Sequence, residues 1–547
     1  MRVGKWKFGI FMVVLLSSLV VAIPVMHYGL LHVNPQDTFF TVARVIGLTN
    51  VWQSPVNFEV LGYHGQIVNS FYPWWTLLPV TVIYHLLGNI SMAYIIFSVI
   101  SSVVTFYITS YSYASVFKKY WWRYESLAVG FVYTFATYRL DNLYFRYAVG
   151  EALAMTFFPL LVAGFYLAAF GDFRKYNWML IVGFVGVGSS HLVSLLITLL
   201  IGFVYVLTSF YWWTNKRVRI INLMKSAVIT GVILMPIVIS MMIQTTNQKI
   251  FTPLPPTNMD GQKLADLFTN ALNNTLAGHT IGFLALILFG IALIKRISSS
   301  TKMSTDLDGW FIVVMVTFFA TTALFPWEFI SKLPGLNILD RIQYVWRLNG
   351  ILVILIAFYA VRMIKISWIR LVAIMMLTVT FGFVSVYHEY ADNSSSILTE
   401  KMVLTGAQNA KYMDYRTEKS VQDVTIRKLV EDRHAMINGK NVPLKIVNSP
   451  NNVEVYLPMN MMEEGRTRNV VLPYFAYTGA KVVSNNGNLL RYKEYKGLIS
   501  IKPSRTVQKV IISYTYSIIQ RIAYIISGLM MTVMMLFWLL HGRFTKK

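Results

Sequence analysis

Residues 8–31 read FGIFMVVLLSSLVVAIPVMHYGLL, an unbroken apolar run that follows Arg2, Lys5 and Lys7. About 20 apolar residues suffice to cross a bilayer as a helix, which satisfies its own backbone hydrogen bonds in lipid. The run is longer than the apolar region of a signal peptide, and no A-x-A cleavage site follows it. The sequence therefore predicts a retained first transmembrane helix with its basic end in the cytoplasm.

The composition of the whole chain indicates the same class of protein. Of 547 residues, 56% are hydrophobic and 13% are charged, whereas a soluble domain carries about 25% charged residues. The formal net charge of +24 sits in short clusters between apolar runs, which argues against nucleic acid as a partner. Because the chain has no cysteine, disulfides, thiolate metal sites and cysteine nucleophiles are excluded.

Twelve apolar stretches are predicted to span the membrane: 8–31, 90–115, 125–138, 151–171, 178–190, 191–213, 223–244, 279–295, 309–327, 347–362, 368–388 and 516–540. Residues 74–88 are apolar but short, and we expect them to lie in the outer interface, which Trp74 and Trp75 favour. Counting them as a span would place Lys118 and Lys119 outside, against the positive-inside rule. This arrangement puts both termini in the cytoplasm of a multi-pass plasma-membrane protein.

The predicted fold is an all-α polytopic membrane bundle with a C-terminal extracytoplasmic, mostly-β domain before the last helix. In that domain Val453, Val455 and Leu457 alternate with the period of a strand. The expected parts are a transmembrane module at 1–388 with a large first outer loop at 32–89, the outer domain at 389–513, and a final helix with a basic cytoplasmic tail at 514–547.

Ionisable groups at membrane boundaries are costly, and each is therefore a functional hypothesis. Asp37 and Arg44 follow the first span, although Asp37 has an alternative role as the cap of the next helix. A second cluster holds two arginines and two carboxylates within residues 138–151. Internal salt bridges, or a favourable carboxylate at a helix start, are the alternatives for this cluster, whose members are Arg139, Asp141, Arg146 and Glu151.

Two further outer positions complete the set of candidates. His191 follows Ser189 and Ser190 at the turn between two spans, where a histidine is more often a satisfied core residue than a ligand. Arg347 follows Trp346 just before the tenth span, and this pair suits either an interface anchor or an anionic head group. No H-E-x-x-H or suitable G-x-S-x-G motif is present, so a protease or an α/β-hydrolase is not expected.

These segments, in this order, resemble the GT-C class of membrane glycosyltransferases. The similarity is greatest to bacterial YfhO-type proteins and to 6-pyruvoyl-tetrahydropterin-synthase-related membrane proteins, and it covers most of the chain. Its elements are the acidic residue after the first helix, an aromatic-proline interfacial segment, a charged second outer loop, a Gly-Tyr-Gly-like turn, a Ser-His pair, a Gln-aromatic-x-Trp-Arg motif and a β module before the last helix. They correspond here to Asp37, Phe71-Tyr72-Pro73, Arg139 to Glu151, Gly62-Tyr63-His64-Gly65, Ser190-His191, Gln343 to Arg347 and the outer domain.

The resemblance implies transfer of a sugar from a polyprenyl-phosphate carrier, held in the membrane lipid, to a cell-envelope acceptor outside a bacterial plasma membrane. It implies Asp37 as the catalytic base, with Asp141 or Glu151 orienting the donor or holding a metal. Arg347 is the favoured phosphate anchor, and the other substrate-binding candidates are Arg44, Arg139, Arg146, His191, Tyr63, His64 and Tyr72.

Three points stay open at this stage. The family often has His four residues after the first-loop acid, where this chain has Thr41, so the role of that His does not carry over. Some members of the class use a divalent cation such as Mg or Mn and others do not. A transporter of lipid-linked or surface glycans, or a non-catalytic scaffold for envelope assembly, would explain the many helices equally well.

Overall fold

The computed structural model describes residues 2–31, 35–253, 259–298, 305–458, 469–504 and 506–544. The chain forms two compact units, each of which is made of three segments. The first unit contains Met1–Thr38, Val82–Thr230 and Leu254–Glu400, and the second contains Phe39–Thr81, Gly231–Pro253 and Lys401–Lys547.

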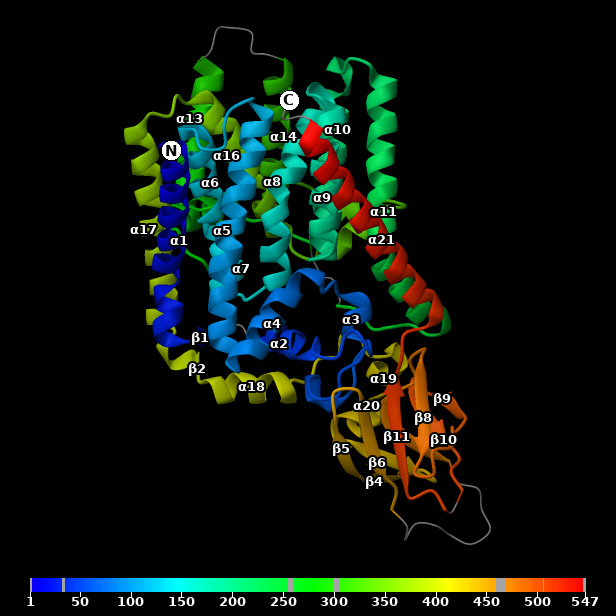
Figure 1. Ribbon diagram of the computed structural model, residues 1–547. Helices are drawn as coiled ribbons and strands as arrows, with labels where there is room; N and C mark the ends of the chain where they lie inside the picture. Colours follow the sequence, from blue (N-terminus) through cyan, green and yellow to red (C-terminus); the bar gives the residue numbers. More distant parts are fainter. Residues whose placement is uncertain are drawn as a thin grey trace. The chain divides into compact units, whose positions relative to one another are not determined.

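The first unit is a bundle of helices. In Figure 1, α1 runs beside α5 and α17, and α8 packs against both α5 and α9. A two-stranded pairing of β1 (Leu30–Leu31) with β2 (Ile397–Leu398) joins the ends of α1 and α17. The helices of this unit are α1 (Arg2–Tyr28), α5 (Ile90–Val116), α6 (Tyr124–Thr134), α7 (Thr137–Tyr144), α8 (Val149–Phe170), α9 (Phe173–Gly188), α10 (Leu192–Ser209), α12 (Leu264–Asn273), α13 (Phe283–Ser298), α14 (Thr305–Thr321), α15 (Trp327–Ser331), α16 (Asn349–Met363) and α17 (Trp368–Asp392).

Among the described residues, eight helices are long and apolar enough to cross a membrane, which confirms a multi-pass membrane protein. Each of the twelve predicted spans coincides with a helix, and eight of these are the long apolar helices, α16 being counted together with the preceding turn as Val345–Met363. The other four have fewer than 18 residues: α6, α9, α13 and α14 have 11, 16, 16 and 17. The number of spans therefore stays a prediction.

Residues 74–88 form the 3-10 turn Trp75–Leu77 and α4 (Leu78–Leu87). At about 1.5 Å per residue a helix of this length cannot cross the roughly 30 Å apolar core of a bilayer. Three side chains of α4 are exposed and apolar: Val82, Leu86 and Leu87. The short helix with an apolar exposed side is the form expected of an interfacial segment.

The charged segment 139–150, predicted as the second outer loop, begins within a short buried helix. Residues 137–144 form α7, and all eight of them are buried. The segment has no long apolar run, so hydropathy alone does not identify it as an interior element. Its charged side chains are thereby brought inside the bundle, where each needs a partner.

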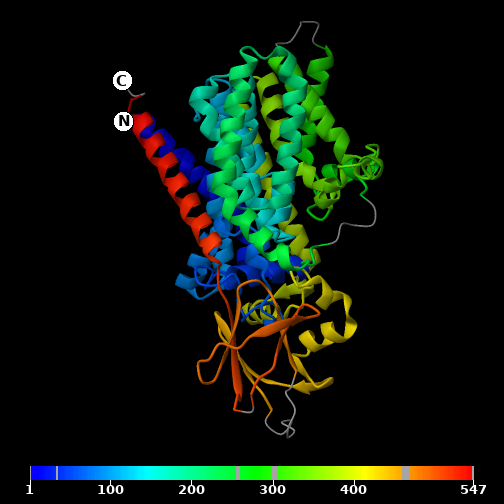
Figure 2. The ribbon, with the colours of Figure 1, turned by 90° about the vertical axis from the view of Figure 1, so that its right-hand side faces the viewer.

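The second unit contains two antiparallel sheets, drawn in orange in Figure 2. One has the order β4-β3-β7-β10-β9 and the other β5-β6-β11-β8. These strands confirm the predicted β module, and α20 (Val424–Glu431) packs on it beside β3 and β7. The strands are β3 (His434–Ile437), β4 (Lys440–Pro443), β5 (Lys445–Asn448), β6 (Asn452–Tyr456), β7 (Val470–Phe475), β8 (Ala480–Ser484), β9 (Tyr492–Tyr495), β10 (Leu498–Ile501) and β11 (Lys509–Tyr514).

The core of the second unit includes a residue from the first outer loop. Phe58 is fully buried and its ring contacts Tyr474 of β7 and Tyr514 of β11, with ring centroids 5.7 Å apart in both cases. The Tyr514 hydroxyl also donates to the Phe475 carbonyl at 2.6 Å, which ties the two sheets together. Residues 39–81 therefore fold with the β module, a grouping that the predicted division at 389 does not contain.

Helices α3 (Val68–Phe71), α19 (Glu418–Gln422) and α21 (Ile518–Phe544) belong to the second unit, and α21 is the predicted last helix. Four other helices have residues in both units: α2 (Pro35–Gly47), α4, α11 (Lys216–Asn247) and α18 (Glu400–Asn409). The first turn of α2, which carries Asp37, belongs to the helical unit.

Candidate active site

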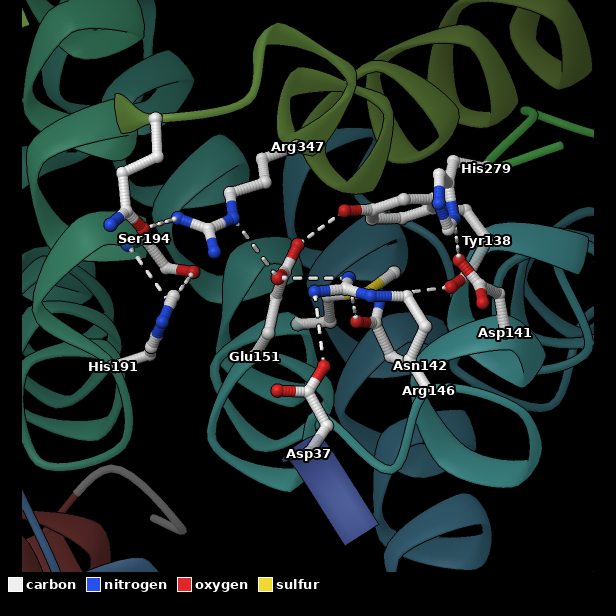
Figure 3. A network of polar contacts seen from close by, with 12 residues as sticks. Asp37, Tyr138, Asp141, Asn142, Arg146, Glu151, His191, Ser194, His279 and Arg347 are labelled. Carbon is white, nitrogen blue, oxygen red and sulfur yellow. Dashed lines mark hydrogen bonds and ion pairs between the residues drawn. The ribbon is translucent and has the colours of Figure 1, made fainter. Parts of the chain in front are cut away.

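A polar network forms where four segments of the helical unit meet. Asp37 lies in the first turn of α2, and Glu151 lies in the first turn of α8. Arg146 lies in the turn between α7 and α8, and Arg347 lies in the 3-10 turn Val345–Leu348 before α16. Figure 3 shows these four side chains converging on one place. Residues that are distant in the sequence thus form a single site.

Arg146 is the centre of this network. Its Nη1 donates to Asn142 Oδ1 at 2.8 Å, and its guanidinium forms ion pairs with Glu151 Oε2 at 3.4 Å and Asp37 Oδ2 at 3.7 Å. The guanidinium also lies over the Trp346 ring, 4.4 Å from the centroid. Only 7% of the side chain is exposed. Because a buried cation is tolerated only when it is paired, the carboxylates hold Arg146 in place.

Glu151 is buried and fully engaged by protein partners. The Tyr138 hydroxyl donates a short hydrogen bond to Oε1, while Oε2 faces Arg146 and the Nε of Arg347 at 3.6 Å. The N-terminus of α8 also favours a negative charge at this position. Two guanidiniums share this carboxylate, so Glu151 orients the arginines and has no oxygen left for a reacting group.

The Arg347 guanidinium is hydrogen-bonded to the protein through its Nη1. Its Nη1 donates to the Ile342 carbonyl at 3.0 Å and to Gln343 Oε1 at 2.9 Å. Within the described residues no hydrogen-bond partner of Nη2 is found. Gln343 has a φ of +64°, a left-handed conformation that costs energy for a residue with a side chain. The chain is therefore strained where it presents this guanidinium.

Asp37 is the most accessible of the three predicted carboxylates. Its side chain is 36% exposed, against 3% for Glu151 and 0% for Asp141. Partial removal of Asp37 from water raises its pKa above the usual 3.8, and the charges of Arg146 and Arg347 oppose that shift. A carboxylate that reaches solvent beside a buried cation has the position and the basicity that a general base needs.

Asp141 pairs with a histidine that the sequence analysis did not select. His279 Nδ1 lies 2.8 Å from Asp141 Oδ2, and its ring stacks on Trp346 with centroids 4.2 Å apart. Asp141 is fully buried, and 24% of the His279 side chain is exposed. His279 is the first residue of the predicted span 279–295. An ionisable group at a membrane boundary is a functional hypothesis, and this rule would have selected His279.

His191 occupies the cap of α10. Its Nδ1 accepts from the Ser194 backbone N–H at 3.3 Å and lies 2.9 Å from Ser194 Oγ. Figure 3 shows the two side chains facing each other beside the network. His191 therefore has a structural role as the cap of α10.

Arg139 does not join the network around Arg146 and bonds to α5 instead. The side chain is fully buried, and its guanidinium donates at 3.0–3.2 Å to the Thr134 carbonyl and to three hydroxyls of α5, those of Ser101, Ser102 and Thr105. The salt bridge suggested between Arg139 and Asp141 is not present among the described residues, where Asp141 pairs with His279 instead. Arg139 therefore ties α7 to α5.

Arg44 and Tyr72 belong to the second unit. The Arg44 guanidinium lies 3.8 Å from the centroid of the Tyr72 ring and donates to the Pro73 carbonyl. Arg44 is 4% exposed. This cation–π contact stabilises the aromatic-proline segment Phe71-Tyr72-Pro73.

Tyr63 and His64 also lie in the second unit, in a turn with several left-handed residues. The Nδ1 of His64 lies 3.2 Å from Arg416 Nη2, and the Arg433 guanidinium lies 5.4 Å from the Tyr63 ring centroid. Burial, reinforced by Arg416, lowers the pKa of His64 well below 6.5. His64 is therefore neutral at physiological pH and accepts a hydrogen bond from Arg416.

The carboxylates of the network do not fit a divalent cation. Among the described residues no group of three or more His, Asp or Glu side chains is placed to hold a metal ion. Glu151 is engaged by Tyr138 and two arginines, and Asp141 is engaged by His279. Guanidiniums beside these oxygens also oppose a second positive charge. We therefore derive no step that passes through a metal.

Comparison with known proteins gives no matching family model and no matching curated protein. Three solved structures align at 9–12% sequence identity. ArnT from Cupriavidus metallidurans, solved with undecaprenyl phosphate, has a TM-score of 0.43 over 74% of each chain. Arabinofuranosyltransferase AftD from Mycobacteria has a TM-score of 0.46 over 93% of this chain and 40% of its own. Arabinosyltransferase EmbB from Mycobacterium smegmatis has a TM-score of 0.35 over 93% and 63%. These neighbours are GT-C glycosyltransferases.

Proposed function

We propose that this protein is a membrane glycosyltransferase that moves a sugar from a polyprenyl-phosphate carrier to an extracytoplasmic cell-envelope acceptor. The observation that carries the proposal is the Arg146–Glu151–Arg347 cluster, which is buried inside a helical membrane bundle and lies against the accessible carboxylate of Asp37. Lipid-linked substrates need a cationic head-group site among apolar helices, and transfer to a hydroxyl needs a base beside it.

The two arginines form the proposed phosphate site. Arginine is always charged, and its planar fork matches phosphate oxygens. Arg347 offers Nη2, and Arg146 offers the edge that faces Asp37 at 3.7 Å. Glu151 acts as a positioning residue because its carboxylate pairs with both guanidiniums.

Asp37 is the proposed general base. In an inverting transfer the acceptor hydroxyl loses its proton as the anomeric carbon loses its leaving group. The accepting carboxylate must lie near the phosphate end of the donor and must be open to the acceptor. Asp37 meets both conditions, because it contacts Arg146 and is 36% exposed.

The test is an assay of the purified protein reconstituted into vesicles with a panel of radiolabelled undecaprenyl-phosphate hexoses and an envelope extract as acceptor. Glycosyl transfer predicts that label moves to the acceptor and that polyprenyl phosphate is released. A transporter would move the intact labelled lipid between leaflets without release. A scaffold would do neither, and either of these results would contradict the proposal.

A further inference from the structure

The Asp141–His279 pair has no role in the mechanism described so far, although it lies against the same network. Trp346 connects the two, because its ring contacts both the Arg146 guanidinium at 4.4 Å and the His279 ring at 4.2 Å. The backbone N–H of Arg146 also donates to the Asp141 carbonyl at 2.8 Å. The pair therefore belongs to the wall of the proposed phosphate site.

The geometry of the pair fixes which nitrogen of His279 faces outward. Nδ1 is 2.8 Å from the Asp141 carboxylate, which only accepts hydrogen bonds when ionised, so Nδ1 carries a proton. No partner for Nε2 is found in the described part of the chain, and 24% of the side chain is exposed. A buried carboxylate bonded to one imidazole nitrogen orients the other nitrogen toward a substrate in many enzymes.

Among the described residues, His279 is the one hydrogen-bond partner of the Asp141 carboxyl group. Asp141 is completely buried, and its Oδ1 has no hydrogen-bond partner within the described residues. Burial raises the pKa of Asp141, and the hydrogen bond from His279 opposes the shift. Asp141 therefore orients the His279 ring and stabilises a positive charge on it whenever Nε2 carries a proton.

The backbone holds the imidazole rigidly. His279 has a φ of +47°, which is a strained conformation for this residue. Its N–H donates to the Leu276 carbonyl at 3.0 Å, and its carbonyl accepts from Asn349 Nδ2 at 2.7 Å. Two backbone bonds therefore hold residue 279, and the bond to Asp141 and the stack on Trp346 hold its ring. Strain that is maintained by this many contacts is characteristic of functional positions.

We propose that His279, oriented by Asp141, is the general acid that donates a proton from Nε2 to the leaving polyprenyl phosphate. This proposal rests on the proposed function. The acceptor oxygen bonds to the anomeric carbon, the bond from that carbon to the phosphate oxygen breaks, and the electron pair stays on that oxygen. Asp37 takes the acceptor's proton and the phosphate takes the proton of Nε2. Asp37 then loses its proton to water, and the Asp141–His279 pair regains one.

The pair would therefore set the alkaline limb of the pH–rate profile, because a general acid must be protonated. The donor is a phosphodiester with a single ionised oxygen, so it does not itself titrate near neutral pH. The charged groups linked to the pair come from several elements. Arg146 after α7 and Glu151 on α8 act on Asp141 through their charges, and Glu389 on α17 accepts from the Ala277 N–H through its Oε1.

The experiment compares kcat and KM of the purified full-length wild type with those of His279→Gln, His279→Asn and Asp141→Asn, from about pH 5 to about pH 9. The donors are the undecaprenyl-phosphate hexoses used above. The matched control is His388→Gln, since His388 is exposed on α17. We expect both His279 variants to lose at least about 10²-fold in kcat with little change in KM and to lose the alkaline limb. Asp141→Asn should move that limb to lower pH.

The other outcomes contradict either the general acid alone or the proposed function. His279→Asn keeps a donor at the Nδ1 position, so recovery of wild-type kcat by this variant would show that His279 only holds Asp141. An alkaline limb that persists in folded His279→Gln would likewise overturn the general acid. If the wild type transfers no sugar, the proposed function fails and the general acid fails with it. If the wild type is active and the variants match it, only the general acid fails.

Discussion

At the scale of single residues, Asp37 is distinguished by its surroundings. Residue type alone leaves two roles for it, a helix cap and a base. The structure places it in the first turn of α2 and adds an ion pair with Arg146 that a cap does not need. Substitution by Asn separates the roles, because Asn also caps helices but cannot accept a proton.

We predict that Asp37→Asn expresses and inserts normally but transfers sugar about 10²–10⁴-fold more slowly. The matched control is Asp266→Asn, which removes an exposed carboxylate from the first turn of α12 and should keep full activity. The base must be ionised, so wild-type activity should fall as the pH drops through the raised pKa of Asp37. Retention of more than about a tenth of the wild-type rate, roughly 1.4 kcal/mol in the barrier, would exclude Asp37 as the base.

Arg347 gives a second prediction at this scale. Arg347→Lys keeps the charge but loses the planar fork that binds Ile342, Gln343 and a phosphate together. We expect normal insertion and a KM for the donor that is raised at least about tenfold. Arg370→Lys, at an exposed position on α17, provides the control. A donor KM equal to that of the wild type would exclude Arg347 as the phosphate anchor.

The sequence identified most members of the network but not their pairing. Asp37, Arg146, Glu151 and Arg347 stand out because charge is costly at a membrane boundary. Arg139 has the same residue type and the same location, yet the helical turn directs it toward hydroxyls of α5. Which side of a buried helix a side chain occupies depends on tertiary packing, and a single sequence does not contain that information.

At the scale of elements, the N-terminus of α5 depends on a residue 310 positions away. Glu400 Oε1 accepts from the Ile90 N–H at 2.6 Å, and its Oε2 accepts from the Ser91 N–H at 3.2 Å and the Ser91 hydroxyl at 2.6 Å. A carboxylate at a helix N-terminus satisfies unpaired N–H groups and interacts favourably with the helix dipole. No local pattern predicts a cap supplied from so far along the chain.

Glu400→Gln should therefore destabilise the helical unit by about 1 kcal/mol, because the neutral amide loses the charge that favours the helix start. Thermal unfolding of the purified protein in detergent measures the effect. The control is Glu328→Gln, which removes an exposed ion pair with Lys332 and should change the midpoint little. Equal shifts in the two variants would contradict the proposed role of Glu400.

Long apolar runs and strand alternation predicted the larger elements well. The helices α1, α5, α8 and α11 follow directly from hydropathy, and the β module follows from alternating valines. The α7 helix does not, since four of its eight residues are charged or polar and their burial depends on partners from other helices. Short interior helices of this kind are stabilised by tertiary contacts, which outweigh local propensity.

At the scale of the whole molecule, the distribution of lysine and arginine predicts an orientation with both termini in the cytoplasm. The absence of cysteine permits a direct test, because a single introduced Cys has no background. We expect Cys at Asn273 or Asn486 to react with an impermeant thiol reagent in intact cells, and Cys at Ser299 to react only after the cells are opened. Asn273 and Asn486 are exposed in the structure, and Ser299 lies outside the described residues. Labelling of all three in intact cells would overturn the topology.

The grouping of residues 39–81 with the β module was not predictable from the sequence. Phe58 lies about 400 residues before the strands that it packs against, and an aromatic residue in a long loop carries no signal of its partner. The sequence placed the boundary where apolar runs end, whereas the compact units follow side-chain packing.

The network around Arg146 is proposed to catalyse glycosyl transfer from a polyprenyl phosphate. This is tested by the release of undecaprenyl phosphate from radiolabelled donors by purified wild type and Asp37→Asn protein, assayed side by side with an envelope extract as acceptor. We expect release by the wild type and at most about a hundredth of that rate in the variant. No release by the wild type from any donor, or equal release by both proteins, would contradict it.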